Sequence, residues 1–186
     1  GARPGGRGTP SKVISPEQLA GLIDMKPGDV YSQDKLRRST DALRNAYSRM
    51  GYVDARIQRF ELRDDTKPEV DLYLVVDEGR PFKTGLINVS GNDITQRKII
   101  LDEMDTIRPD RPLDTSSEKR GDKYVTLAEQ KLEESRLFEP GSIKLTVQPE
   151  RPETPGYRDV LLEVKETNTG SFNFGAAVNS DAGVTG

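Results

Sequence analysis

The sequence predicts an α+β protein made of two successive modules, each with the order β-α-α-β-β. Segments with apolar residues at helical spacing are followed by segments in which apolar and polar residues alternate, and this order occurs twice along the 186 residues. Hydrophobic residues make up 33% of the chain and charged residues 32%, which favours two small cores over one deep core.

Residues 1–11 are rich in Gly, Pro and Arg and are expected to form a flexible lead. Order is expected from Ile14 onward. Ser15, Pro16 and Gln18 form the pattern of a capping box with a proline at the first helical position. The apolar residues of this short helix recur at i, i+3 and i+4: Leu19, Leu22 and Ile23.

A second helix is expected from Ser32, which caps it, to Met50, and Gly51 is the residue type that favours a left-handed helix end. Two strands follow, over residues 53–62 and 70–76, and the turn between them predicts a hairpin. No opening strand is visible in this first module, because a Gly/Pro-rich lead suits a strand poorly.

The same pattern then repeats. Its expected elements are a strand over 87–89, a helix over 95–104, a longer helix opened by Asp114 or Ser117 and running through Leu132, and strands over 143–147 and 160–164. The two modules share one internal spacing, in which Leu43, Tyr47 and Gly51 correspond to Ala128, Leu132 and Arg136. This correspondence indicates a repeated supersecondary unit.

A last segment alternates apolar with small or polar residues at Phe172, Phe174, Ala176 and Val178. This alternation is typical of a strand of a membrane β-barrel, and equally of any amphipathic strand. No apolar run reaches the roughly 18 residues of a membrane helix, and no signal peptide is visible, as expected for a processed or truncated product.

The chain contains no His, no Cys and no Trp. Ser-His-Asp and Cys-His nucleophile systems, zinc sites with Cys or His ligands, haem attachment and disulfides are therefore excluded. The formal net charge of −3 offers no broad basic field for nucleic acid or anionic lipid. The composition favours a binding protein over an enzyme, with no cofactor and no metal.

One motif leaves a catalytic hypothesis open. Ser32-Gln33-Asp34-Lys35 and Ser116-Ser117-Glu118-Lys119 both match S-x-x-K, the spacing of a serine nucleophile and a lysine base. A Ser/Lys hydrolase using Ser117 or Ser32 is one interpretation. The alternative is that both serines cap the second helix of their module, since a serine oxygen accepts a hydrogen bond from an unpaired helix N–H.

Several segments resemble the POTRA domains of BamA-type outer-membrane barrel-assembly proteins. The matching segments are Lys26–Tyr31, Tyr47–Val53, the bridge Val76–Phe82, the strand Ile87–Asn92 and the junction Val164–Gly175 with the sequence VKETNTGSFNFG. The resemblance covers residues 14–186. It departs from the family in the missing opening strand and at Arg136, where a glycine often follows the second helix.

The resemblance implies two tandem POTRA modules, each with a small three-stranded mixed sheet packed on two helices. We expect a penultimate module over residues 12–81, a membrane-proximal module over 82–167, and the start of a truncated outer-membrane β-barrel over 168–186. It further implies a periplasmic location, attached to the bacterial outer membrane through the barrel in the full-length protein. The implied function is the assembly of β-barrel proteins, with accessory lipoproteins as further partners.

The edges of such a sheet carry unpaired N–H and C=O groups, to which an unfolded client can add a strand. By resemblance, the client edge is the strand after each second helix. The residues assigned to these edges are Ala55, Ile57 and Arg59, and Ile143, Leu145 and Val147. The alternative is that charged residues on these strands protect the edges from aggregation.

Two further alternatives remain open. The acidic residues Asp102, Glu103 and Asp105 form either a docking face for an accessory subunit or a merely solvated helix face, and they lack the loop pattern of a calcium site. The same scaffold would also suit a transporter that secretes one dedicated partner, which would bind one client in preference to unrelated barrel precursors.

Overall fold

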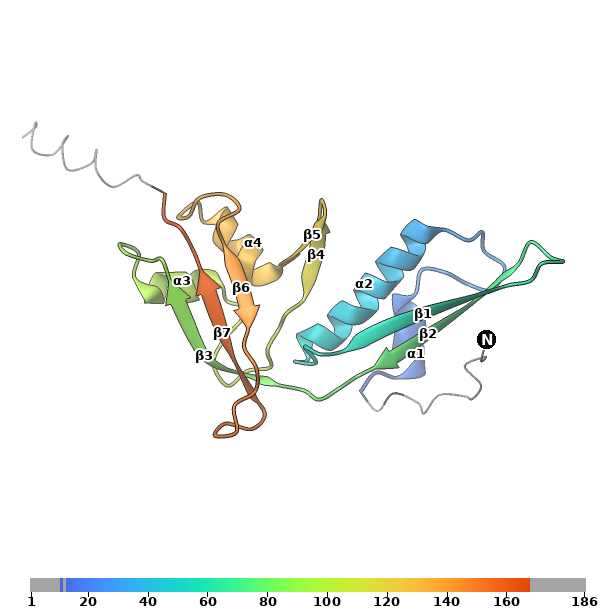
Figure 1. Cartoon of the computed structure of the whole chain (residues 1–186), viewed down its shortest axis with the longest axis horizontal. Coiled ribbons are helices and arrows are strands. Elements are labelled where there is room, and N and C mark those ends of the chain that lie inside the picture. The colour runs from blue at the N-terminus through green and yellow to red at the C-terminus, as the bar shows by residue number, and fades with distance from the viewer. Residues whose placement is uncertain (1–10, 12, 168–186) are drawn as a thin grey trace, which may run out of the picture.

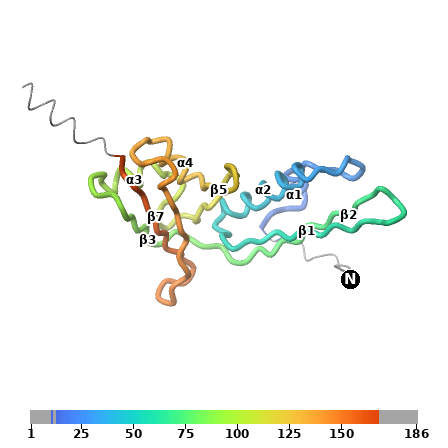
Figure 2. The backbone as a smooth tube through the Cα atoms, turned by 45° about the horizontal axis from the view of Figure 1, so that its top comes forward, coloured from blue at the N-terminus to red at the C-terminus, as the bar shows by residue number. Residues whose placement is uncertain are grey.

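The computed structural model describes residues 11 and 13–167. They form two halves, each with a β-sheet and helices, joined by an extended bridge (Figure 1). The first half contains helices α1 (Pro16–Leu22) and α2 (Gln33–Arg49) and the antiparallel hairpin of β1 (Arg56–Arg63) and β2 (Val70–Asp77). Figure 2 shows that the turn of this hairpin lies at the end of the molecule furthest from the second sheet. The α+β fold class is confirmed.

Local sequence explains the helices of the first half. The Ser15 side chain accepts from the Gln18 N–H while the Gln18 side chain accepts from the Ser15 N–H, so α1 has its predicted capping box. Ser32 caps α2 by accepting from the Lys35 N–H. The core beneath these helices is small, with Ile14, Leu43 and Tyr47 buried.

The second half contains a three-stranded mixed sheet. Strand β3 (Lys83–Ser90) pairs in parallel with β7 (Tyr157–Glu163), and β6 (Lys144–Val147) pairs antiparallel with β7, which places β6 at one edge. Helices α3 (Arg97–Glu103) and α4 (Leu127–Glu134) pack on this sheet. The core is larger than the first one and consists of buried Ile87, Ile100, Met104, Ile107, Leu113, Ala128, Leu132, Phe138, Val160, Leu162 and Val164.

The expected long helix from Asp114 or Ser117 is wrong. A short hairpin, β4 (Ser117–Arg120) and β5 (Lys123–Thr126), takes its first part, with Gly121 at φ 62° in the turn. The helix begins only at Leu127, where Thr126 and Glu129 form a capping box. The charged run 117–123 offers no apolar stripe to bury, so a helix there would have had nothing to pack on.

The mixed three-stranded sheet expected in each module is present in the second half, whereas the first sheet has two strands within the described residues. Both halves share the expected end of the second helix. Gly51 has φ 88° and Arg136 has φ 58°, so an arginine takes the left-handed conformation that glycine takes in the first half.

The bridge between the halves is anchored on Phe82, which is buried. The Phe82 N–H donates to the Gly51 carbonyl at 2.9 Å, and its own carbonyl accepts from the Leu113 N–H at 3.0 Å. The guanidinium groups of Arg80 and Arg158 lie over its ring, 5.4 and 4.9 Å from the centroid. The bridge is thereby tied to elements of both halves.

Candidate protein-binding edges

Strand β1 has one side paired with β2 and its other side without a partner strand in the described residues. Ile57 and Arg59 lie in β1, and Ala55 lies just before it, where its N–H donates to the Tyr52 carbonyl. The side chains of Ala55 and Ile57 pack against the first core. The three predicted residues therefore lie on the edge strand or directly before it, and Arg59 is exposed.

The outer face of the hairpin carries exposed large side chains. Phe60 is paired with Tyr73, and both are about two-fifths exposed, at 41% and 42%. Leu62 and Val75 are exposed on the same face, because side chains alternate along a strand. This apolar surface lies opposite the helices.

A groove of about 510 Å³ runs beside β2, between Val70, Leu72 and Leu74 of that strand and the loop that joins α1 to α2. The loop is held by the Tyr31 hydroxyl, which donates to Glu61 on β1. This hydrogen bond lowers the pKa of Glu61 and raises that of Tyr31. No local sequence pattern predicts this groove, since the loop is remote from β2 in the chain.

Strand β6 forms the corresponding edge of the second sheet. Leu145 and Val147 lie in β6 and Ile143 just before it, and all three side chains pack against the larger core. The Leu145 N–H donates to the Glu129 carboxylate on α4 at 2.7 Å. Glu129 is not among the predicted site residues. The Thr126-x-x-Glu129 pattern signals its capping role, but nothing in the local sequence indicates its bond to Leu145.

The acidic residues of the second half do not act as one group. Asp102 and Glu103 are exposed on α3, whereas Asp105, just after this helix, pairs with Lys131 of α4. The hydrogen bond from Lys131 holds the pKa of Asp105 below its ordinary value. Within residues 11 and 13–167, no cluster of three or more carboxylates is arranged to hold a metal ion.

The two S-x-x-K serines occupy different environments. Ser32 caps α2, as predicted, but Ser116 and Ser117 cap no helix. The Ser116 hydroxyl donates to Asp114 at 2.6 Å, and Ser117 begins β4. The expectation that both motifs cap a helix is therefore wrong for the second one, because the hairpin replaces the start of the helix.

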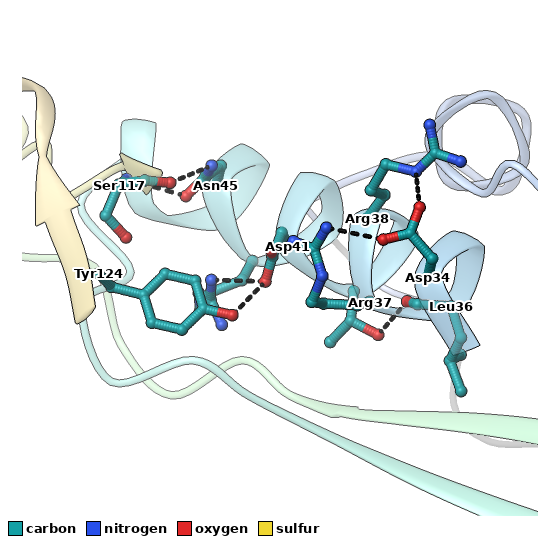
Figure 3. A network of polar contacts seen from close by, with 10 residues as sticks. Asp34, Leu36, Arg37, Arg38, Asp41, Asn45, Ser117 and Tyr124 are labelled. Carbon is teal, nitrogen blue, oxygen red and sulfur yellow. Dashed lines mark hydrogen bonds and ion pairs between the residues drawn. The ribbon is translucent and has the colours of Figure 1, made fainter. Parts of the chain in front are cut away.

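The main chain of Ser117 contacts the first half (Figure 3). Its N–H donates to the Asn45 side-chain oxygen at 3.1 Å, and its carbonyl accepts from the Asn45 amide at 2.9 Å. Nearby, the Tyr124 hydroxyl donates to Asp41 at 3.0 Å while Arg44 lies 4.5 Å from the Tyr124 ring centroid. The β4–β5 hairpin thus packs on α2, a contact that no sequence motif predicted.

The predicted barrel-start residues Phe172, Phe174, Ala176 and Val178 lie outside the described residues. Of the junction motif, Val164–Thr167 is described. The Glu166 carboxylate accepts from the Ile94 N–H at 2.9 Å and from the Thr95 N–H. Among the described helices, none is both long enough and apolar enough to span a bilayer.

Comparison with known proteins identifies similar sequences and folds. Residues 7–79 match the POTRA family, described as a surface antigen variable number repeat. The outer membrane protein assembly factor BamA of Buchnera aphidicola is 24% identical over 167 residues, which is 90% of this chain and 25% of that protein. The chain therefore spans about a quarter of the length of this curated relative.

Two solved structures share the fold. The BamA of Haemophilus ducreyi lacking POTRA domains 1–3 has a TM-score of 0.65 and 23% identity, covering 88% of this chain and 30% of that one. POTRA domains 3–5 of Haemophilus influenzae BamA have a TM-score of 0.61 and 18% identity, covering 81% and 55%. At these identities the likeness supports the fold.

Proposed function

Because this chain is a POTRA protein of the BamA type, we propose that it is the periplasmic part of an outer-membrane protein assembly factor. In this proposal residues 12–81 and 82–167 are two successive POTRA modules, and residues 168–186 begin a barrel that attaches the full-length protein to the outer membrane. The proposed activity is binding of unfolded β-barrel precursors.

The observation that carries the proposal is the position of β1 and β6. Each follows the second helix of its half, and each lies at the edge of its sheet in the described residues. An added strand would bind through main-chain hydrogen bonds, which depend little on client sequence. Binding that depends little on the client sequence suits a protein that handles many precursors.

The test is an amide titration of the isotope-labelled chain with a synthetic peptide from a barrel-precursor strand. We expect shifts of amides within 55–62 or 142–148, and loss of these shifts when alternate peptide residues are replaced by proline, which lacks an N–H. Shifts confined to other places, such as the groove beside β2, or none at millimolar peptide, would contradict strand addition.

Selectivity separates this function from that of a secretion transporter. We expect peptides from unrelated barrel precursors to bind with affinities within about threefold of one another, because the main chain is the shared determinant. A preference of about a hundredfold for one client would favour the transporter instead.

We also propose that accessory lipoproteins dock on the exposed acidic surface of α3, through Asp102 and Glu103. Asp105, paired with Lys131, would orient that surface rather than contact the partner. Reversing both charges, Asp102→Lys with Glu103→Lys, should reduce co-purification of outer-membrane lipoproteins with the full-length protein. Asp122→Lys, in the β4–β5 turn, is the matched control and should leave co-purification unchanged.

A further inference from the structure

The two candidate edges differ in the state of their main chain. On β6, the Gln148 N–H donates to the Asp159 carbonyl of β7, so the main chain of alternate residues faces β7. The main-chain N–H and C=O groups of Ile143, Leu145 and Val147 therefore face outward, toward any incoming strand. Leu145 is the middle one of the three.

The outward N–H of Leu145 already has an acceptor. Glu129 Oε1 accepts from it at 2.7 Å, while Glu129 Oε2 accepts from the Thr126 N–H at 2.8 Å. A carboxylate is a stronger acceptor than the neutral carbonyl that a client strand would offer. Because each carboxylate oxygen accepts a main-chain hydrogen bond, the Glu129 side chain is held in one position at the β6 edge.

Strand β1 differs from β6 in this respect. In the described part of the chain, no side chain hydrogen-bonds to the main chain of Arg56–Arg63. By the correspondence of Leu43 with Ala128, the residue of α2 at the position of Glu129 is Arg44, which pairs with Asp41. An arginine guanidinium only donates, so Arg44 is unable to accept from an edge N–H.

We infer that Glu129 is a built-in competitor for the β6 edge, so that a client strand binds first at β1 and reaches β6 only by displacing this carboxylate. The inference rests on the proposed strand addition and assigns an order to its two sites. It also names the residue that sets the order.

The first measurement needs no client. Glu129→Ala removes the acceptor, and we expect amide hydrogen exchange at Leu145 to become about tenfold faster while the main-chain amides of β7 keep their protection. Thr126→Ala is the control for the helix cap, because it removes the Thr126 oxygen that caps α4 and leaves the Glu129–Leu145 bond possible. Unchanged exchange at Leu145 in Glu129→Ala would overturn the inference whether or not clients bind.

The second measurement repeats the peptide titration on each variant. In the parent chain, amides of β1 should respond at about tenfold lower peptide concentration than amides of β6. Glu129→Ala should bring the β6 response to that of β1 and leave β1 unchanged, whereas Thr126→Ala should behave as the parent. Equal responses of both edges in the parent would overturn the order. If no amide of either edge shifts with peptide in any variant, strand addition itself is overturned, and the order with it.

Discussion

Gly51 and Arg136 occupy the same position, directly after the second helix of each half, and both have a positive φ. They differ in what surrounds them. A Cβ on Gly51 would lie 2.3 Å from the Phe82 carbonyl oxygen, on the bridge between the halves. Arg136 is exposed, so only backbone strain opposes a side chain there.

Gly51→Ala should therefore lower the free energy of unfolding by about 2 kcal/mol or more, the cost of a strained φ plus the displacement of the bridge. Arg136→Gly should raise it by up to about 1 kcal/mol, because relief of the left-handed strain outweighs the freedom that glycine gains in the unfolded chain. Urea unfolding followed by circular dichroism measures both. If the stability lost in Gly51→Ala is no larger than the stability gained in Arg136→Gly, the bridge does not constrain Gly51.

At the scale of elements, the segment that follows β7 is held against the loop after β3 by Glu166. Burial acts to raise the pKa of Glu166, but the hydrogen bonds from Thr95 and Ile94 outweigh it, and the pKa lies below its ordinary value of 4.5. A depressed carboxyl pKa stabilises the folded state above pH 4.5. That contribution is lost as pH falls through the folded pKa.

Glu166→Gln should cost about 1–2 kcal/mol at neutral pH, because the amide oxygen is a weaker acceptor for two N–H groups. The difference from the parent should disappear well below pH 4.5, where Glu166 itself is protonated. Thermal unfolding at the two pH values tests this. Glu163→Gln, at an exposed position on β7, is the matched control and should change stability by less than about 0.5 kcal/mol at either pH.

At the scale of the whole molecule, the angle between the halves depends on the packing of the β4–β5 hairpin on α2. Asn45 exchanges two hydrogen bonds with Ser117, and Tyr124 contacts both Asp41 and Arg44. Arg158 adds a contact to Asp54 at 3.1 Å. Together with the Phe82 bridge, these contacts resist bending between the halves.

Asn45→Ala combined with Tyr124→Ala should free this angle while leaving each half folded. The chain has no native cysteine, so spin labels attached at Asp65→Cys and Glu153→Cys report the distance between the halves. We expect a broader distance distribution in the double variant than in the parent. Arg38→Ala, which removes only ion pairs to Asp34 and Asp24, should leave the distribution unchanged. An equally narrow distribution in the double variant would assign the angle to the bridge alone.

Much of the fold could be predicted because its determinants are local. The capping box at Ser15, the cap at Ser32, the alternation along β2 and the paired positions of Gly51 and Arg136 each need only a few neighbouring residues. The start of α4 was misplaced although Thr126 and Glu129 carry a capping-box pattern. From sequence alone, the charged run before them is expected to form the first turns of the same helix.

The sequence by itself determined the α+β class and which strand of each half follows the second helix. These depend on periodicity and capping, which are interactions between neighbours in the chain. Only the tertiary structure decided that Glu129 accepts from the Leu145 N–H on β6, whereas no side chain of the described residues bonds to the main chain of β1, and that Asn45 contacts Ser117, 72 residues later. Such contacts depend on how separate elements pack, and a hydrogen bond between distant residues leaves no periodic mark in the sequence.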